Sequence, residues 1–192
     1  KEFDAEALKA GFTRSKFDPC MYYLFNFSGT SVSPLRGVMG SHVDDTATGG
    51  EGDKYDQAIA HLKARFPYRK WRVGRADFCG SQYMQDPVTK EIFQGQELFA
   101  NNMRPISLNK GRARQTEQMA TNKEISCLRA VNGSGNWLAK ETRPDLSCQV
   151  SMSQQSFPDP KVSHLLQANQ MVRRAEQFSD ICIKYVRIPL HE

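Results

Sequence analysis

The sequence predicts an α+β protein in which an antiparallel β-hairpin and one helix lead into a mainly helical second half. Three observations favour this fold class. Residues 20–27 are a short run rich in aromatic side chains, which is typical of a buried strand. Residues 53–66 place apolar side chains at helical spacing on one face. From about residue 96 onward, apolar residues recur mostly with the period of a helix.

In the first half, turn residues separate two predicted strands. The strand over residues 20–27 is followed by a turn over residues 28–34, which contain Ser, Gly and Pro. A second strand is predicted over residues 35–43, and Asp44-Asp45 follows it directly. We interpret Gly49-Gly50 as the breaker that ends this segment. The pattern therefore predicts a β-hairpin with two carboxylates at its tip.

A helix and several short strands are predicted next. Asp53 can cap the helix over residues 53–66, and Pro67 ends it. Short strands follow over residues 71–73, 77–85 and 91–94. An Asp86-Pro87 turn joins the last two of these strands.

The second half predicts helices over residues 124–139, 144–157 and 160–178. Residues 181–188 then alternate like a strand. Gly133 and Gly135 either kink the first of these helices or allow close packing. Arg143 precedes the second helix, where it could meet a phosphate, but an ion pair with Asp145 is the favoured interpretation.

Composition places the 192 residues among ordinary globular proteins, with 39% hydrophobic and 24% charged side chains. The longest apolar run, residues 21–25, is far too short to span a membrane. Residues 1–6 lack the pattern of a secretion signal and the first residue is not Met, so we expect an intracellular chain that is part of a longer protein. Five widely spaced cysteines argue against a disulfide framework. Four scattered histidines argue against zinc.

Positive charge is concentrated in two short segments, although the net charge is only +5. Residues 61–75 and 104–114 contain no acidic residue. Their basic side chains are Lys63, Arg65, Arg69, Lys70, Arg72, Arg75, Arg104, Lys110, Arg112 and Arg114. Such clusters suit a polyanion, because each neutralised phosphate releases counterions. Phe66, Tyr68 and Trp71 could stack on bases; the alternative is a solvated basic loop whose aromatic rings turn into the core.

The paired carboxylates of Asp44 and Asp45 suggest magnesium chemistry on phosphate esters. Hard oxygen ligands suit Mg²⁺, which keeps water and substrate phosphates at its remaining positions. Adjacent residues of a regular strand point to opposite faces, so both can serve one site only if the backbone turns there. A third carboxylate from a neighbouring strand would complete the cage. The alternative is a turn in which each aspartate caps nearby amides.

Four motifs occur in the order found in one protein family. They are the segment over residues 11–22, His42-Val43-Asp44-Asp45, Phe78-Cys79-Gly80 and Thr142-Arg143-Pro144-Asp145-Leu146. Similarity continues over residues 149–151 and 168–175. On these motifs, nearly the whole chain resembles the reverse transcriptase of copia-type LTR retrotransposon Pol polyproteins.

The resemblance implies a partial right-hand polymerase palm, consisting of an antiparallel β-hairpin plus helix, followed by a helical thumb and connection. In that scheme residues 1–95 are the C-terminal part of the palm with a primer-grip-like hairpin. Residues 96–157 resemble the thumb, and residues 158–192 begin the connection toward ribonuclease H. The implied function is RNA-directed DNA polymerisation with Mg²⁺ or Mn²⁺ as cofactor.

The resemblance also implies partners and residue roles. The partners are an RNA template, a DNA primer and the rest of the polyprotein, in the cytoplasm (virus-like particle) or nucleus and without a membrane. Asp44 would be the metal-binding catalytic carboxylate, and Asp45 its neighbour with a lesser or indirect metal role. His42 would lie beside the primer terminus, and Phe78-Cys79-Gly80 would support the primer backbone.

The family's first catalytic aspartate and its nucleotide-pocket motif would lie upstream of Gly11, and residues 1–10 supply neither. We therefore expect the isolated chain to bind template–primer and to hold part of a two-metal site without polymerising. Binding of dNTP would need the upstream region. The alternative, from a different class, is a non-catalytic nucleic-acid-binding remnant of a retroelement that uses only the basic clusters. A third hypothesis is a degenerate product with no selected function.

Overall fold

The structure is a computed structural model that describes residues 2–26, 34–43 and 45–186. The chain divides into two compact units, Lys1–Val73 and Gly74–Glu192. Each unit combines helices with an antiparallel sheet, in agreement with the predicted α+β class. The boundary lies between residues 73 and 74, whereas the sequence predicted a change at residue 95. The strands after residue 74 belong to the same unit as the helices that follow them.

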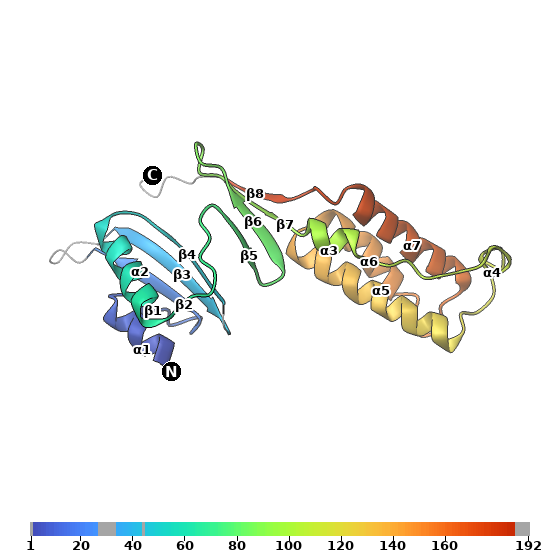
Figure 1. Cartoon of the computed structure of the whole chain (residues 1–192). Helices are drawn as coiled ribbons and strands as arrows, with labels where there is room; N and C mark the ends of the chain where they lie inside the picture. The colour runs from blue at the N-terminus through green and yellow to red at the C-terminus, as the bar shows by residue number, and fades with distance from the viewer. Residues whose placement is uncertain (1, 27–33, 44, 187–192) are drawn as a thin grey trace. The chain divides into compact units, whose positions relative to one another are not determined.

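The first unit contains one four-stranded sheet and two helices (Figure 1). Its elements are α1 Glu2–Lys9, β1 Thr13–Arg14, β2 Met21–Phe25, β3 Leu35–His42, β4 Asp45–Gly50 and α2 Asp53–Arg65. The strand order is β1-β2-β3-β4, and all neighbours are antiparallel. The two predicted strands and the predicted helix after residue 53 are therefore confirmed.

Three local details of this unit differ from the sequence prediction. Gly49 and Gly50 do not break the segment, because they lie inside β4 opposite Val38 and Gly37. The N-cap of α2 is Gly52 rather than Asp53. Helix α1 is an additional element that the apolar pattern did not indicate.

Helices α1 and α2 pack against one face of the sheet (Figure 1). The buried apolar residues are Ala7, Phe12, Tyr22, Leu24, Met39, Ala58, Ile59 and Leu62. The hydroxyl of Tyr22 donates to Asp4 Oδ1 at 3.1 Å, which ties β2 to α1. The carboxylate of Glu6 lies 2.9 Å from His61 Nε2, which ties α1 to α2. This core holds the β3–β4 hairpin, which carries His42 and Asp45.

The ring of Tyr55, on α2, packs directly against two glycines of the sheet, Gly37 and Gly50. A Cβ added to Gly50 would lie 2.3 Å from the Tyr55 ring, and one added to Gly37 would lie 2.6 Å from it. The two glycines are paired across β3 and β4. The Tyr55 hydroxyl makes a 3.1 Å hydrogen bond with Thr48 Oγ1 of β4. The close approach of this ring therefore requires glycine on both strands.

The second unit begins with a four-stranded antiparallel sheet and continues into helices (Figure 1). Its strands are β5 Arg75–Phe78, β6 Ser81–Gln85, β7 Ile92–Gly95 and β8 Ile183–Tyr185, in that spatial order. Its helices are α3 Glu97–Asn101, α4 Lys110–Ala113, α5 Asn122–Glu141, the short 3₁₀ helix η1 Pro144–Leu146, α6 Ser147–Gln154 and α7 Val162–Gln177.

Two predicted strands of this region are wrong, and the remaining elements are confirmed. Residues 71–73 are not a strand, and the range 77–85 is a hairpin with a turn at Cys79 and Gly80 rather than one strand. The predicted Asp86-Pro87 turn is present, with the amide of Lys90 donating to Asp86 O at 3.0 Å. Of the last predicted strand, residues 183–185 form β8 and pair with β7, while residues 187 and 188 lie outside the described residues.

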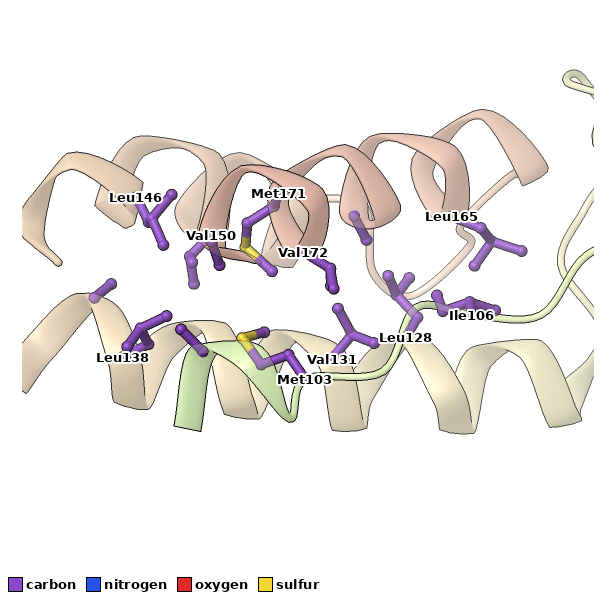
Figure 2. Close-up of a cluster of buried hydrophobic side chains, with 14 residues drawn as sticks. Met103, Ile106, Leu128, Val131, Leu138, Leu146, Val150, Leu165, Met171 and Val172 are labelled. Carbon is purple, nitrogen blue, oxygen red and sulfur yellow. The ribbon is translucent and has the colours of Figure 1, made fainter. Parts of the chain in front are cut away.

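The helical part of the second unit encloses the larger hydrophobic core (Figure 2). Apolar side chains from α5, α6 and α7 meet there, with Leu128, Leu146, Leu165 and Val172 fully buried. At Gly135 an added Cβ would lie 2.6 Å from Met171 Cε and 3.2 Å from Val150 Cγ2. The sequence left open whether the glycines kink this helix or allow close packing, and Gly135 allows close packing.

An extended segment after α3 crosses the bundle and is held by one asparagine. The side chain of Asn169 accepts from the amide of Ile106 at 2.7 Å and donates to its carbonyl at 2.8 Å. This pair satisfies a backbone unit that has no strand partner, while Met103 and Ile106 fill the core. Across the described ranges, no helix is both long and apolar enough to cross a membrane.

Candidate functional site

Asp45, one of the two predicted catalytic residues, lies at the tip of the β3–β4 hairpin. His42 ends β3 and is paired with Asp45, the first residue of β4. Val43 has φ of 53° and is strongly exposed, so the backbone reverses at this point. Asp44 lies outside the described residues. Because cross-strand partners face the same side of a sheet, His42 and Asp45 are neighbours on one exposed face.

The carboxylate of Asp45 is an exposed hard oxygen donor of the type that Mg²⁺ prefers. Within residues 2–26, 34–43 and 45–186, no group of three or more His, Cys, Asp and Glu side chains is placed to hold a metal ion. A magnesium site that used Asp45 would therefore need further ligands. The other ligands would come from Asp44, water, phosphate oxygens or a further carboxylate.

Two members of the first basic cluster are engaged within the first unit. The ammonium of Lys63 lies 3.9 Å from the centre of the Trp71 ring. The guanidinium of Arg65 pairs with Glu2 and lies 3.9 Å from Glu6 Oε1. These contacts connect the C-terminal end of α2 to α1 and to residue 71. Lys63 and Arg65 therefore have structural partners besides any phosphate.

All six members of this cluster are exposed, Lys63 and Arg65 included. Arg69, Lys70 and Arg72 follow α2 in the first unit, and Arg75 begins β5 in the second. For Arg69 and Lys70, the described part of the chain contains no ion pair. Their ammonium and guanidinium groups are therefore available to a polyanion.

The aromatic residues near these charges face mainly inward. Phe66 and Trp71 pack against the core of the first unit, and the Phe66 ring lies 5.5 Å from that of Phe3. The rings of Tyr68 and Trp71 meet edge to face at 5.2 Å. Burial raises the pKa of the Tyr68 hydroxyl, and its hydrogen bond with Thr46 opposes that shift. For Phe66 and Trp71, the interpretation as core aromatics is the one that the structure supports.

The motif Phe78-Cys79-Gly80 forms the turn between β5 and β6. Cys79 and Gly80 have φ of 50° and 77°, so both lie in the left-handed region. Two successive positive φ values match the right-handed twist of a tight hairpin. Phe78 is half-buried, and Cys79 and Gly80 are exposed. The predicted primer-grip-like segment is therefore a two-residue hairpin turn with an accessible apex.

Buried polar residues that sequence reasoning missed connect this turn to the helices. Thr142 Oγ1 donates to Gln96 Oε1 at 2.9 Å, and Gln96 Nε2 donates to Gly80 O at 3.4 Å. Thr142 is only 1% exposed and Gln96 only 2%. Trp137 of α5 also reaches the turn, with its Cζ2 atom 3.6 Å from the place of a Cβ on Gly80.

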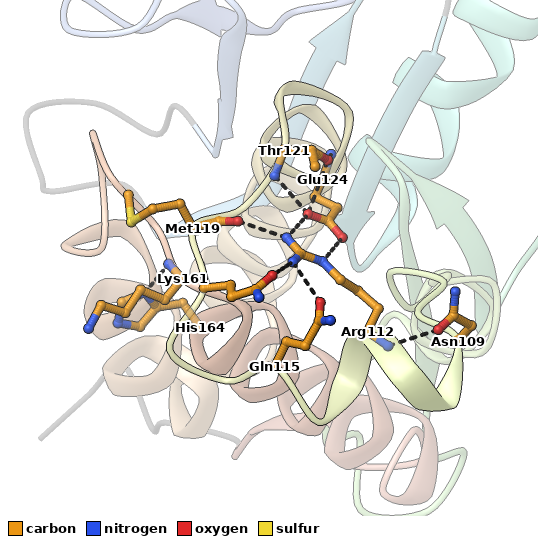
Figure 3. A network of polar contacts seen from close by, with 9 residues as sticks. Asn109, Arg112, Gln115, Met119, Thr121, Glu124, Lys161 and His164 are labelled. Carbon is orange, nitrogen blue, oxygen red and sulfur yellow. Dashed lines mark hydrogen bonds and ion pairs between the residues drawn. The ribbon is translucent and has the colours of Figure 1, made fainter.

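The second basic cluster separates into exposed and internally bonded residues. Lys110 and Arg114 are exposed at the two ends of α4. Arg112, between them, uses all five guanidinium N–H groups inside the unit (Figure 3). Its acceptors are Glu124 Oε1 and Oε2 at 2.9 and 2.8 Å, Gln115 Oε1 at 3.2 Å, Gln118 Oε1 at 2.9 Å and Met119 O at 2.7 Å. Arg112 was predicted to bind nucleic acid, and we remove it from that set because its donors are already satisfied.

This arginine stabilises the start of the longest helix. Thr121 caps α5, and Glu124 closes a capping box by accepting from the Thr121 amide at 2.7 Å. The hydrogen bonds from Arg112, together with those from Thr121, lower the pKa of the Glu124 carboxyl from 4.5 to about 2. A group with a depressed pKa in the folded state stabilises the fold only above its unfolded pKa.

We therefore expect the wild-type chain to lose stability as the pH falls from about 4.5 toward 2, because Glu124 must then be protonated. Glu124→Gln removes this proton uptake and should flatten the dependence of the urea midpoint on pH between about pH 5 and pH 2. Glu176→Gln removes an exposed carboxylate from α7 and serves as the matched control. Equal slopes for wild type and Glu124→Gln would contradict this account.

Arg143 is buried and paired with groups of its own unit. Arg143 is 1% exposed, and its Nε and Nη2 donate to the two oxygens of Asp145 at 2.8 and 3.0 Å. Its Nη1 donates to the carbonyl of Phe178 at 2.7 Å, just past the end of α7. The guanidinium lowers the pKa of the Asp145 carboxyl. The predicted Arg143–Asp145 pair is confirmed, and the motif joins the ends of α5 and α7.

Each unit has a surface cleft among its described residues. The cleft of the second unit has a volume of about 270 Å³ and lies between α3 and α5, where Phe99, Met103 and Arg104 line it. The cleft of the first unit has a volume of about 490 Å³ and lies at the start of α2, lined by Arg36 and Lys54 among others. Neither of these clefts is lined by Asp45 or by the predicted primer-grip residues.

Comparison with known proteins adds no relative to this picture. No protein-family model matches the chain, and neither the curated proteins nor the solved structures include a match.

Proposed function

We propose that the chain is part of an RNA-directed DNA polymerase of the copia-type retrotransposon kind and that it binds a primer annealed to an RNA template. The observation that carries the proposal is the β3–β4 hairpin, whose tight connection places His42 and Asp45 side by side on an exposed face. The sequence resemblance assigns the primer terminus and the metal to this tip. The two-residue turn at Cys79 and Gly80 has an exposed apex, which supports the primer-grip assignment.

In this proposal, exposed basic side chains contact phosphates and the hairpin tip contacts the reacting end of the primer. The phosphate contacts come from Arg69, Lys70, Arg72, Arg75, Lys110 and Arg114. Asp44 and Asp45 would hold Mg²⁺, which would activate the primer 3′-hydroxyl and balance charge on the phosphates. His42 would orient the primer terminus beside them.

Fluorescence anisotropy with a labelled DNA primer on an RNA template tests binding. We expect the affinity of the full chain to fall steeply between about 50 and 200 mM salt, because phosphate contacts release counterions. The double variant Arg69→Gln/Lys70→Gln should reduce the slope of log K against log salt by about 2. Lys123→Gln/Lys140→Gln removes the same charge from exposed positions of α5 and serves as the control. Equal effects of the two double variants would contradict the assignment.

The same duplex distinguishes a polymerase part from a non-catalytic remnant. If the hairpin tip holds metal, Mg²⁺ should change the affinity of the wild type for the duplex. It should leave the affinity of Asp44→Ala/Asp45→Ala unchanged. A remnant that uses only its basic residues would respond to Mg²⁺ identically with and without these carboxylates. Incorporation of dNTP by the isolated chain is not expected, and incorporation that disappears in Asp44→Ala would overturn that expectation.

A further inference from the structure

The turn at Cys79 and Gly80 is strained and yet well anchored. Cys79 is not glycine, so its φ of 50° is an unfavourable conformation that persists only where the surroundings determine it. Two sets of hydrogen bonds from neighbouring residues hold the turn in this conformation. Strained backbone of this kind clusters at positions that contact ligands.

One anchor is the buried polar chain from α5 to the turn. Thr142 lies at the C-terminal end of α5, and Gln96 lies at the junction of β7 and α3. The hydroxyl of Thr142 fixes the amide of Gln96, because the 2.9 Å bond leaves the Gln96 NH₂ group directed at Gly80 O. Three segments that are distant in sequence thus meet at one backbone carbonyl of the turn.

The second anchor lies on the neighbouring strands. Gln94 Nε2 donates to Ser81 Oγ at 3.2 Å, and Tyr185 donates its hydroxyl proton to Gln94 Oε1 at 2.7 Å. Ser81, which directly follows the turn, is 1% exposed. Trp137 packs beside Gly80 on the helical side. The base of the turn is therefore enclosed, while its apex at Cys79 remains exposed.

A polar chain in this position contributes orientation more than stability. A pair of buried hydrogen-bonding groups can be replaced by apolar groups of similar shape with little net change in folding free energy. Gln96 is hydrogen-bonded both to Thr142 and to the turn, so the pair fixes the direction of the Gly80 carbonyl relative to α5. An apolar pair of equal volume would fill the space without fixing that direction.

We propose that Gln96 and Thr142 are positioning residues, which hold the Cys79–Gly80 turn in the orientation that contacts the nucleic-acid backbone. This inference rests on the proposed function, since it concerns how the same site binds its template–primer. Neither residue touches the nucleic acid in this scheme. The Thr of the Thr-Arg-Pro-Asp motif thereby acquires a role distinct from that of Arg143.

The test replaces the polar pair while keeping its shape. In the full chain, Gln96→Met/Thr142→Val should weaken binding of the RNA–DNA duplex by about fivefold. Amide exchange of residues 78–81 should become faster, and helical circular dichroism at 222 nm should show an unchanged urea midpoint. Thr142→Ser keeps the hydroxyl and should bind like the wild type.

A buried polar pair elsewhere in the bundle is the matched control. Ser153 Oγ donates to Asn132 Oδ1 at 2.7 Å between α5 and α6, and both residues are buried. Asn132→Leu/Ser153→Ala removes this pair and should leave duplex affinity and exchange of residues 78–81 unchanged. A loss of affinity equal to that of the Gln96/Thr142 variant would show a general effect of bundle packing and overturn the inference.

The outcomes separate this inference from the proposed function. If the wild type does not bind the duplex, the proposed function fails and the inference fails with it. If the wild type binds and Gln96→Met/Thr142→Val binds equally well, the inference fails and the proposed function stands. If the double variant does not fold, amide exchange of the wild type provides the test. Binding of the duplex should slow the exchange of residues 78–81 and not that of the exposed turn over residues 86–90. Without this protection the Cys79–Gly80 turn does not contact the duplex, and the inference fails.

Discussion

Replacing Arg143 by methionine is expected to lower the free energy of unfolding of the second unit by about 3 kcal/mol. Methionine fills part of the buried volume, but Asp145 loses its closest cationic partner and keeps the more distant 3.7 Å contact with Arg174. The carbonyl of Phe178, near the C-terminal end of α7, also loses its cationic donor. The effect is large because the Phe178 carbonyl loses a charged hydrogen-bond donor and Asp145, whose side chain is 31% exposed, loses both bonds to the guanidinium. Arg143→Lys keeps the charge but cannot form the bidentate hydrogen bond, so its free energy of unfolding should lie between those of the wild type and Arg143→Met.

The two tryptophans allow this loss to be measured in the correct unit. Trp71 belongs to the first unit and Trp137 to the second, so a Trp71→Phe background reports on the second unit alone. The urea midpoint of Trp137 fluorescence should fall in Arg143→Met. Arg173→Met changes an exposed arginine of α7 and should shift the free energy by less than about 0.5 kcal/mol. Similar midpoints for both variants would refute the structural role of Arg143.

The second large effect is expected at a glycine in β4. Gly50→Ala should destabilise the first unit by about 2 kcal/mol, because its Cβ would lie 2.3 Å from the Tyr55 ring and 2.5 Å from the carbonyl oxygen of Arg36. That oxygen accepts the amide of Glu51 at 2.9 Å, so it cannot move without weakening this bond. Movement of the Tyr55 ring would likewise disturb its bond with Thr48.

The neighbouring glycine is the control for this effect. A Cβ on Gly49 would meet no heavy atom within 4 Å. Gly49→Ala should therefore be neutral or slightly stabilising, because alanine restricts the unfolded chain more than glycine does. Trp71 fluorescence in a Trp137→Phe background measures both variants in the first unit. A loss of stability in Gly49→Ala that matches Gly50→Ala would mean that strand propensity, rather than contact with Tyr55, explains the result.

Local patterns predicted the elements that their own residues can specify. The helical spacing of Ala58, Ile59 and Leu62 predicted α2, and these three residues are buried as the pattern requires. The short aromatic run before residue 27 predicted β2, and Tyr22 and Leu24 of this strand are buried. The Arg143–Asp145 pair was also predictable, because the two residues lie two positions apart at a helix start.

Other elements depend on contacts that no local pattern contains. Gly49-Gly50 reads as a breaker, and only Tyr55, packed across two strands, explains why glycine continues the strand there. Residues 77–85 read as one strand, because nothing local indicates that Cys79 adopts a positive φ. The anchors of that turn, Gln96 and Thr142, are separated by 46 positions.

The basic residues show the same division between local and distant information. The amino-acid sequence alone determined that two segments concentrate positive charge and that two carboxylates follow a strand. It could not distinguish Arg112 from Lys110 and Arg114, since all three occur in one acid-free run. Only the tertiary structure decided that Arg112 is saturated by five acceptors while its neighbours are exposed. Charge and periodicity are properties of neighbouring residues, whereas hydrogen-bond saturation depends on groups that folding brings together from distant positions.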